Sequence, residues 1–266
     1  MHIPRISRPH IGGALRKIKH VCADKEKAAK RTLPGMLMMA QSFAIPAHAP
    51  GIEKFIKTTT SAAEDVFEHH SPDFTIVKGM IQRVVPDISD EFVAQVVETA
   101  EQVKCSPQDL TALLYKESRF KPDARNGNFG GLGQMNKKSL NLSISHADKD
   151  ENARHGITPI AIEKFLSLPR EQQMPYVRNY ILAMKNVYIK NPNKELSGGE
   201  LYGLFYTPGR INKKFLSSAN DPATAKFYQQ NKGLDFNKDT KITKQDLQQV
   251  LNHVKMTDLN INIAKK

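Results

Sequence analysis

The feature that most constrains the fold of this chain is a pair of capped amphipathic helices between residues 89 and 117. Ser89 is placed to cap a helix that begins at Asp90. The apolar side chains of this helix recur at the spacing of one helical face, at Phe92, Val93, Val96 and Val97. The next helix opens at Ser106–Asp109 with a capping serine, a first-turn proline and an acidic third position. Two adjacent helices with apolar faces predict a core of packed helices.

The rest of the chain repeats this helical pattern. Segments that alternate between apolar and polar residues are scarce, so we expect few strands and a mostly α fold. Further helices are expected at 159–167, 170–190, 199–206, 221–230 and 243–255. The hydrophobic content of 39% indicates a globular protein, with one sizeable core and appendages or with two small domains.

The charge of the chain is strongly positive but uneven. The net charge is +12, and residues 1–31 hold nine Lys or Arg against two acidic residues. Over half of the excess therefore lies in this leader. Nucleic-acid binding needs the charge gathered on one face, so we expect no nucleic-acid partner. The smaller excess in the rest of the chain suits an anionic polymer such as a cell wall.

Residues 1–50 are interpreted as a basic leader with an export signal. From Lys30 to Ala49, basic residues precede an apolar segment and then small residues, the order typical of such signals. Cleavage is expected after Ala49 or after Ala44, with the mature protein in the periplasm or cell envelope. The alternative is a basic arm with a short apolar patch. Residues 51–88 show no clear long period and are expected to form a linker or partly ordered arm.

Two further expectations concern cysteines and membranes. Cys105 is the one cysteine outside the leader, since Cys22 lies within it, so cysteine usage does not fix the compartment. No apolar run is long enough to cross a bilayer, and we expect a monomer without a membrane span in the mature chain.

Glu117 is the strongest catalytic candidate in the sequence. It follows three leucines of its own helix by seven, four and three residues, which places it on the apolar face. Burial disfavours the charged carboxylate and raises its pKa, as a general acid at neutral pH requires. The alternative is a solvated glutamate at the end of a helix.

The residues after Glu117 carry a family resemblance. The segment Glu117–Ala124 reads E-S-R-F-K-P-D-A, and Gly130–Met135 reads G-G-L-G-Q-M. Together they resemble the lytic transglycosylase (SLT) family, in which E-S-x-F-x-P-x-A precedes G-L-x-Q. Residues 168–177 and 201–209 resemble a phage-tail-associated branch of that family. The resemblance covers roughly residues 90–220, and we expect a lysozyme-like helical catalytic domain over 89–220.

The resemblance implies an activity and a site. It implies cleavage, without water, of the β-1,4 bond between N-acetylmuramic acid and N-acetylglucosamine in peptidoglycan glycan strands. Glu117 would serve as the single acid and base, with no cofactor for catalysis. Ser118, Gln134, Met135 and Tyr206 are the expected substrate-binding residues. Whether Phe205 or Tyr206 contacts the glutamate stays open, because the motif matches imperfectly there. The alternatives are a hydrolytic goose-type muramidase and a non-catalytic wall-binding module that depends on calcium.

Residues 221–266 are expected to form a C-terminal helical segment with an EF-hand-like loop. The positions that ligate calcium in such a loop hold Asp235, Asn237, Asp239, the backbone of Lys241 and Asp246. Thr240 stands where the loop usually has glycine, and Asp246 is shorter than the usual glutamate. We expect structural Ca²⁺ that stabilises this segment and leaves the chemistry unaffected. The alternative is a polar surface turn in which Thr243 caps the last helix.

Overall fold

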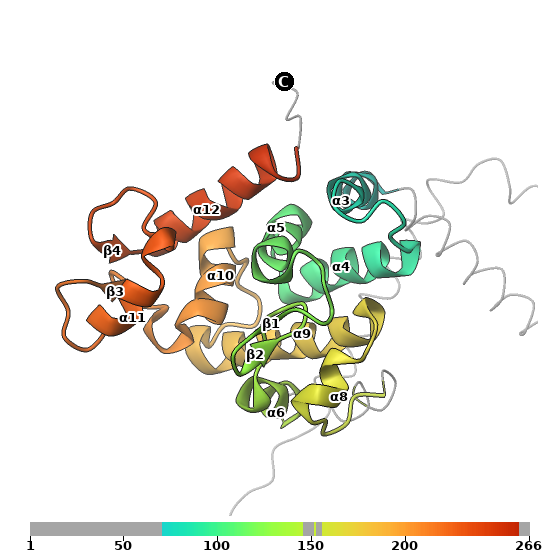
Figure 1. The fold of residues 1–266 in the computed structure, drawn as a ribbon, viewed down its shortest axis with the longest axis horizontal. Coiled ribbons are helices and arrows are strands. Elements are labelled where there is room, and N and C mark those ends of the chain that lie inside the picture. The colour runs from blue at the N-terminus through green and yellow to red at the C-terminus, as the bar shows by residue number, and fades with distance from the viewer. Residues whose placement is uncertain (1–70, 146–151, 153–155, 261–266) are drawn as a thin grey trace, which may run out of the picture. The chain divides into compact units, whose positions relative to one another are not determined.

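The protein is described from a computed structural model, which describes residues 71–145, 152 and 156–260 (Figure 1). The described part of the chain is mostly α-helical, as the sequence predicts. The expected leader and export signal over 1–50 lie outside the described residues. None of the described helices combines the length and hydrophobicity that a bilayer crossing requires.

The first described helix, α3 (Pro72–Gln82), corrects the expectation for residues 51–88. Ser71 accepts a hydrogen bond from the amide of Phe74, and Pro72 occupies the first turn, where its missing N–H costs nothing. The buried side chains of α3 face α4 and α5. Residues 72–82 therefore belong to the core and are not a linker.

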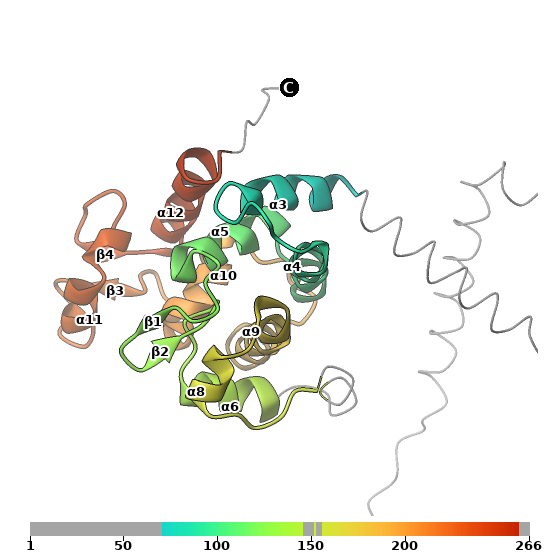
Figure 2. The same cartoon turned by 45° about the vertical axis from the view of Figure 1, so that its right-hand side comes forward.

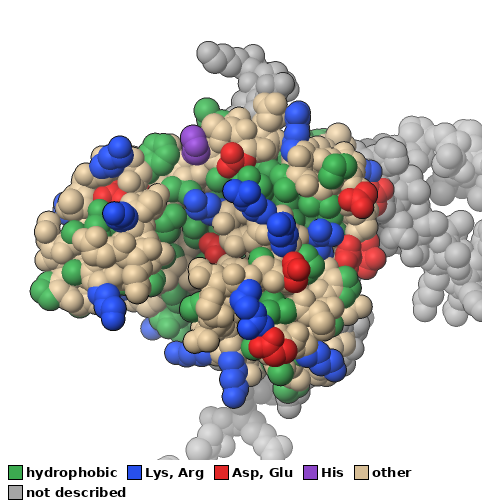
Figure 3. Space-filling model, in the orientation of Figure 1, with side chains coloured by type: hydrophobic (Ala, Val, Ile, Leu, Met, Phe, Trp, Pro, Cys, Tyr) green, Lys and Arg blue, Asp and Glu red, His purple; other side chains and the backbone are tan. Residues whose placement is uncertain are grey.

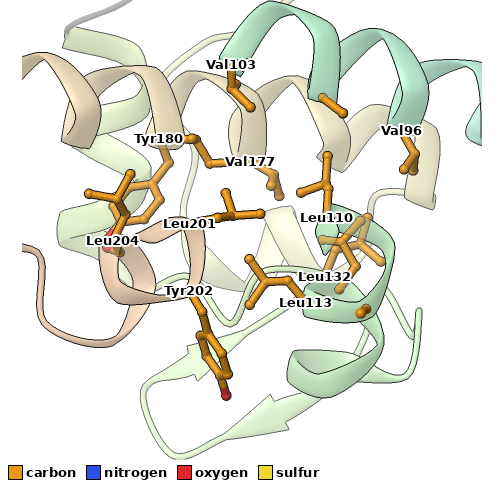
Figure 4. Close-up of a cluster of buried hydrophobic side chains, with 14 of the residues drawn as sticks. Val96, Val103, Leu110, Leu113, Leu132, Val177, Tyr180, Leu201, Tyr202 and Leu204 are labelled. Atoms are coloured by element: carbon orange, nitrogen blue, oxygen red, sulfur yellow. Dashed lines mark hydrogen bonds between the residues drawn. The ribbon is translucent and has the colours of Figure 1, made fainter. Parts of the chain in front are cut away.

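Helices α4 (Asp90–Val103) and α5 (Pro107–Ser118) follow the predicted caps. Ser89 and Ser106 each accept a hydrogen bond from the amide three residues later. Both helices end on a residue in the left-handed conformation, at Lys104 and Arg119. Their apolar faces meet the central helix α9 in a cluster that includes Val96, Leu110 and Val177 (Figure 4).

A short antiparallel hairpin follows α5. Strands β1 (Arg125–Asn126) and β2 (Phe129–Gly130) are joined by a two-residue loop in which Gly127 has φ +58°. Helix α6 (Lys137–Ser145) comes next and packs against α9 (Arg170–Met184), with the short α8 (Ile162–Leu166) between them in sequence. A π-helical segment, η3 (Lys185–Ile189), extends α9, so residues 170–189 match the long predicted helix closely.

The C-terminal elements form part of the same compact unit (Figure 2). Helix α10 (Gly198–Tyr206) is followed by the 3₁₀ turn η4 (Pro208–Arg210), β3 (Ser217–Ser218), α11 (Ala225–Gln230), the 3₁₀ turn η5 (Lys232–Leu234), β4 (Lys241–Ile242) and α12 (Lys244–Thr257). Strand β3 pairs with β4, and α12 packs against both α5 and α10. The expected boundary between 220 and 221 therefore does not divide the fold, because it would separate paired strands.

Two predicted helices are shorter than expected. Residues 159–161 precede α8 as irregular chain, and Leu168-Pro169 follows it at once. Residues 221–224 form a turn that the Asp221 carboxylate holds, by accepting hydrogen bonds from the Ala223 amide and the Thr224 hydroxyl. Side-chain capping of this kind competes with helix formation, so α11 begins at Ala225.

Candidate active site

Glu117 lies in the last turn of α5, on the side of the helix where Leu113 and Leu114 are fully buried. The residue as a whole is partly exposed. Desolvation by the surrounding protein raises its pKa to about 7, against 4.5 for an ordinary glutamate. A hydrogen bond from Tyr202 and the charge of Lys116 act in the opposite direction, and burial outweighs both.

The chain turns sharply after this helix. Arg119 and Phe120 both have positive φ, at 53° and 61°, a conformation that costs free energy for residues with a side chain. Burial holds the turn in place: Phe120 is fully buried against Tyr115, and its carbonyl oxygen accepts a hydrogen bond from Arg170 Nε at 2.7 Å. The turn ends α5 one residue after Ser118 and leads the chain into the hairpin.

Tyr202 is the residue that contacts Glu117. It lies in α10, it is buried, and its hydroxyl group donates a hydrogen bond to the Glu117 carboxyl group. Figure 4 shows Tyr202 at the edge of the apolar cluster, with its hydroxyl directed away from it. Tyr202 is not among the residues that the sequence predicts for the site. A signal existed: Tyr202 precedes Phe205 and Tyr206 by three and four residues, so the three rings share one side of α10.

The two rings that the sequence offered as partners of Glu117 lie elsewhere. The Tyr206 hydroxyl shares a hydrogen bond of 2.7 Å with Ser217 Oγ in β3, and its ring stacks on Phe227 with centroids 4.7 Å apart. The Phe205 ring packs edge-on against Tyr180 with centroids 5.2 Å apart. Tyr206 is half-buried, so contact with a substrate stays a prediction.

The glycine-rich turn 130–135 is held by a buried glutamine. Gln173 in α9 is fully buried and accepts a hydrogen bond from the Leu132 amide at 3.0 Å. Its amide group donates to the carbonyl oxygens of Pro122, Phe165 and Leu168. Gly131 has φ +74°, and a Cβ atom there would meet Phe165 and Gln173, which explains the glycine. Gln173 therefore fixes the turn that follows the C-terminal end of α5, a role that no sequence pattern indicated.

Two of the expected substrate-binding residues, Ser118 and Met135, have buried side chains. Ser118 is buried, and its hydroxyl donates to the Leu114 carbonyl at 3.0 Å, so it points back along its own helix. The Met135 side chain is 1% exposed and belongs to the core, while its backbone pairs with Gly130. Both side chains are buried in this structure, and their contact with a substrate stays a prediction. Helical back-bonding and core packing account for their sequence pattern.

Gln134, a third expected substrate-binding residue, has a side-chain oxygen without a hydrogen-bond partner among the described residues. It is half-buried at φ +45°, and its Nε2 donates to the carbonyl oxygens of Ala124 and Gly131 at 3.4 and 3.3 Å. Its buried Oε1 accepts no hydrogen bond from any residue that the structure describes. An unsatisfied carbonyl oxygen of this kind suits the N–H of an N-acetyl group.

The loop 235–246, predicted to be EF-hand-like, is held together by hydrogen bonds from its own backbone amides to its acidic side chains. Asp235 accepts hydrogen bonds from the amides of Asp239 and Thr240, and Asp239 from that of Lys241. The carbonyl oxygens of Thr240 and Ile242 accept hydrogen bonds from the backbone amides of Ala219 and Leu216, which flank β3. Carbonyl groups alternate in direction along a strand, so the carbonyl group of Lys241 points away from β3. Thr240 has φ +69°, the conformation that the usual glycine provides.

The acidic side chains of this loop already have protein partners. Asp246 accepts hydrogen bonds from the amide and hydroxyl of Thr243 as a capping box for α12, and Asp235 accepts from the Tyr228 hydroxyl at 2.7 Å. No group of three or more His, Cys, Asp or Glu side chains in the described ranges is arranged to hold a metal ion. The predicted ligands include an amide and a backbone carbonyl as well as carboxylates, so calcium binding stays a prediction.

The surface beside the site is hollowed. Figure 3 shows the hollow between the C-terminal elements α11, β3 and β4 and the β1–β2 hairpin. Asp123, the nearest second carboxylate in the sequence, is exposed in the turn that leads to the hairpin. No carboxylate contributes to the pKa of Glu117, whose causes are burial, Tyr202 and Lys116. The site therefore presents one proton-carrying carboxyl group with a tyrosine donor.

Comparison with known proteins gives no match to a protein-family model, to a curated protein or to a solved structure. The functional argument therefore rests on the motif residues and on the geometry around Glu117.

Proposed function

We propose that the protein is a peptidoglycan lytic transglycosylase with a lysozyme-like catalytic domain. It cleaves the β-1,4 bond between N-acetylmuramic acid and N-acetylglucosamine and leaves a 1,6-anhydro-muramoyl end. The family resemblance around Glu117 supports the substrate class. The observation that carries the proposal is the state of Glu117: a partly exposed residue whose carboxyl group has a pKa of about 7, with no second carboxylate acting on it.

The Glu117 carboxyl group acts first as the acid and then as the base. Glu117, protonated near neutral pH, donates its proton to the glycosidic oxygen as the bond from that oxygen to C1 of the muramoyl unit breaks. The hydroxyl on C6 of the same sugar then bonds to C1 and gives its proton to the Glu117 carboxylate. The acid is thereby restored, and no water is consumed. Tyr202 donates a hydrogen bond to the carboxylate that exists between the two steps.

The causes of the raised pKa of Glu117 include no second carboxylate of the described residues, and this favours the route over ordinary hydrolysis. Most glycosidases use two carboxyl groups, one of which activates water or attacks the sugar. Among the described residues, no second carboxylate affects the pKa of Glu117. The buried Tyr202 hydroxyl, whose own pKa is raised well above 10, remains a neutral donor and does not act as a base.

Mass spectrometry of a purified-sacculus digest tests the proposal. We expect fragments with 1,6-anhydro-muramoyl ends, which are one water lighter than hydrolytic fragments. Fragments with reducing ends would identify a hydrolytic muramidase instead. A chain that binds sacculi and releases no fragments would be a wall-binding module, and the assignment of an enzyme would then be wrong.

The proposal includes export, because peptidoglycan lies outside the cytoplasm. The order of basic, apolar and small residues over 30–49 supports it. N-terminal sequencing of the native protein should give a first residue at 45 or 50. A native protein that begins at Met1 would contradict export by this signal.

A further inference from the structure

A cavity of about 370 Å³ lies on the side of the β1–β2 hairpin that faces α6 and α8. Its lining is almost entirely polar or charged, with Ile162 as the one apolar side chain. The lining residues come from the hairpin, the start of α6 and the start of α8: Arg125, Gly127, Asn128, Asn136, Lys137, Lys138, Ile162 and Glu163. A cavity with this lining suits a polar ligand rather than an apolar one.

The charge of the cavity is positive. Arg125 forms an ion pair with Glu163, which neutralises both groups. Lys137 and Lys138 have no carboxylate partner within the described ranges, so two positive charges remain. The amide groups of Asn128 and Asn136 add hydrogen-bond donors at the same place. A second hollow on the outer side of α6 is also lined by both lysines, so they border cavities on two sides.

The positive charge of the cavity extends along the chain to the segment that contains Glu117. Residues 116–138 hold six Lys or Arg against Glu117 and Asp123, whereas residues 73–109 hold three against seven acidic residues. Residues 73–109 are therefore acidic, and residues 116–138, which include Glu117, are basic. A contrast of this kind within one fold directs an anionic ligand towards the hairpin.

We propose that this cavity binds a carboxylate of the short peptide that is attached to the muramoyl unit of peptidoglycan. The proposal rests on the proposed function, because it names the part of the same substrate that lies beside the cleaved bond. The muramoyl peptide carries free carboxylates several residues away from the sugar. Glycan strands from which an amidase has removed the peptide keep only the lactyl carboxylate on the muramoyl unit itself. Lys137 and Lys138 bind the carboxylate as point charges, and the asparagine amides orient it.

An extended tetrapeptide is long enough to cross the β1–β2 hairpin, on which the cavity lies. The hairpin is two strands wide, and neighbouring strands lie about 4.8 Å apart. An extended peptide covers about 3.3 Å per residue, so four residues span about 13 Å. The turn that follows the hairpin lies next to the site, since a Cβ atom at Gly133 would contact Phe205, whose ring packs on Tyr180. Tyr180 is close enough to Glu117 to be influenced by its charge.

The test compares two substrates and two double variants. The substrates are glycan strands with their peptides and the same strands after an amidase has removed the peptides. One variant is Lys137→Gln with Lys138→Gln. The control is Lys213→Gln with Lys214→Gln, which removes the same charge from an exposed pair outside the cavity lining.

We expect the wild-type protein to cleave peptide-bearing strands about fivefold faster at low salt, with the preference reduced at high salt. The Lys137/Lys138 variant should cleave both substrates at one rate, and the Lys213/Lys214 control should keep the preference. Equal wild-type rates on the two substrates, or an equal loss of preference in both variants, would overturn the cavity proposal and leave the proposed activity standing.

A protein that cleaves neither substrate would refute the proposed function instead. The cavity is then tested by calorimetry with a free tetrapeptide that carries two carboxylates. Binding that the Lys137/Lys138 variant lacks and the control retains would support the cavity. Absence of binding to the wild-type protein would overturn it.

Discussion

The Tyr202 hydroxyl of α10 donates a hydrogen bond to the Glu117 carboxyl group of α5. This contact joins two helices that are separated by more than 80 residues in the sequence. It favours the ionised carboxylate, while burial favours the protonated form by a larger amount. The balance of these two effects gives a pKa of about 7, so Glu117 can both lose and regain a proton near neutral pH.

Tyr202→Phe should move the alkaline limb of the pH–rate profile to higher pH. The change removes the hydrogen bond that lowers the pKa of Glu117, so burial raises it further and the acid stays protonated to a higher pH. The maximal rate should fall by about tenfold or more, because the carboxylate between the two steps loses a donor. The measurement is the rate of sacculus digestion between pH 5 and pH 9.

Tyr206→Phe is the matched control for that profile. Tyr206 hydrogen-bonds to Ser217 and is not among the causes of the shifted pKa of Glu117. The alkaline limb of the pH–rate profile of Tyr206→Phe should stay at the wild-type position. An unshifted limb in Tyr202→Phe, or an equal shift in both variants, would show that Tyr202 does not set the pKa of Glu117.

Glu117→Gln should stabilise the protein at neutral and alkaline pH. The folded-state pKa is raised to about 7 from 4.5, so the stability that the protonated group provides is full below pH 4.5 and is lost as the pH rises through 7. Above pH 7 the variant should gain about 2 kcal/mol, reduced from the full linkage value because the residue is partly exposed. Urea unfolding at pH 4 and pH 8 measures the difference.

The exposed Glu101 in α4 provides the control, since Glu101→Gln should change the free energy of unfolding by little at either pH. If Glu117→Gln has the same effect on stability at pH 4 and pH 8, the carboxyl group is not desolvated as described.

The helices of this fold were predictable because their signals are local. A capping serine and a first-turn proline act within one turn, which explains why α4 and α5 begin where the sequence indicates. Helix α3 was missed although it has the same signals at Ser71 and Pro72. Its apolar residues were too few to show a long period, and its burial depends on α4 and α5, which lie later in the chain.

The site was predictable in part. Glu117 is marked by the leucines of its own helix, and the structure gives it the raised pKa that this position indicates. Tyr202 and Gln173 reach the site from α10 and α9, and the periodicity of one helix cannot show what another helix presents to it. Met135, which the sequence predicts as a substrate ligand, has a side chain that is 1% exposed and belongs to the core, and its place in the motif could not indicate this burial.

Lys255→Met should destabilise the protein and also reduce its activity. Lys255 in α12 forms an ion pair with Asp109 in the first turn of α5 at 2.6 Å, and both side chains are largely buried. Removal of the lysine leaves a buried carboxylate with only Gln248 Nε2, at 3.5 Å, as a side-chain partner, at a cost of about 2–4 kcal/mol. This ion pair joins α12 to α5, the helix that contains Glu117. Loss of the pair should therefore also disturb the position of Glu117 and lower the activity.

The exposed pair of Lys78 and Asp90 is the control for this ion pair. Lys78→Met should cost less than about 1 kcal/mol, because water screens both groups. Denaturant unfolding and digestion rates of the two variants make the comparison. A Lys255→Met protein as stable as Lys78→Met would show that α12 contributes nothing to α5 through this pair.

Calcium at millimolar concentration should raise the Tm if the loop 235–246 binds it, since a ligand of the folded state adds stability. Asp235→Ala together with Asp239→Ala should abolish that rise, because two of the predicted carboxylate ligands are lost. Lys238→Ala changes a residue outside the ligand positions and should leave the rise in place. A wild-type Tm that is insensitive to calcium would identify the loop as a polar turn.

The central claim is that the Glu117 carboxyl group performs the cleavage. The most direct measurement is mass spectrometry of sacculi digested by wild-type protein and by Glu117→Gln at equal concentrations of folded protein. The amide keeps the shape of the side chain and cannot exchange a proton at both steps. We expect abundant 1,6-anhydro-muramoyl fragments from the wild-type protein and a loss of at least about a hundredfold in the variant. Anhydro fragments from Glu117→Gln at more than a few per cent of the wild-type yield would contradict the claim.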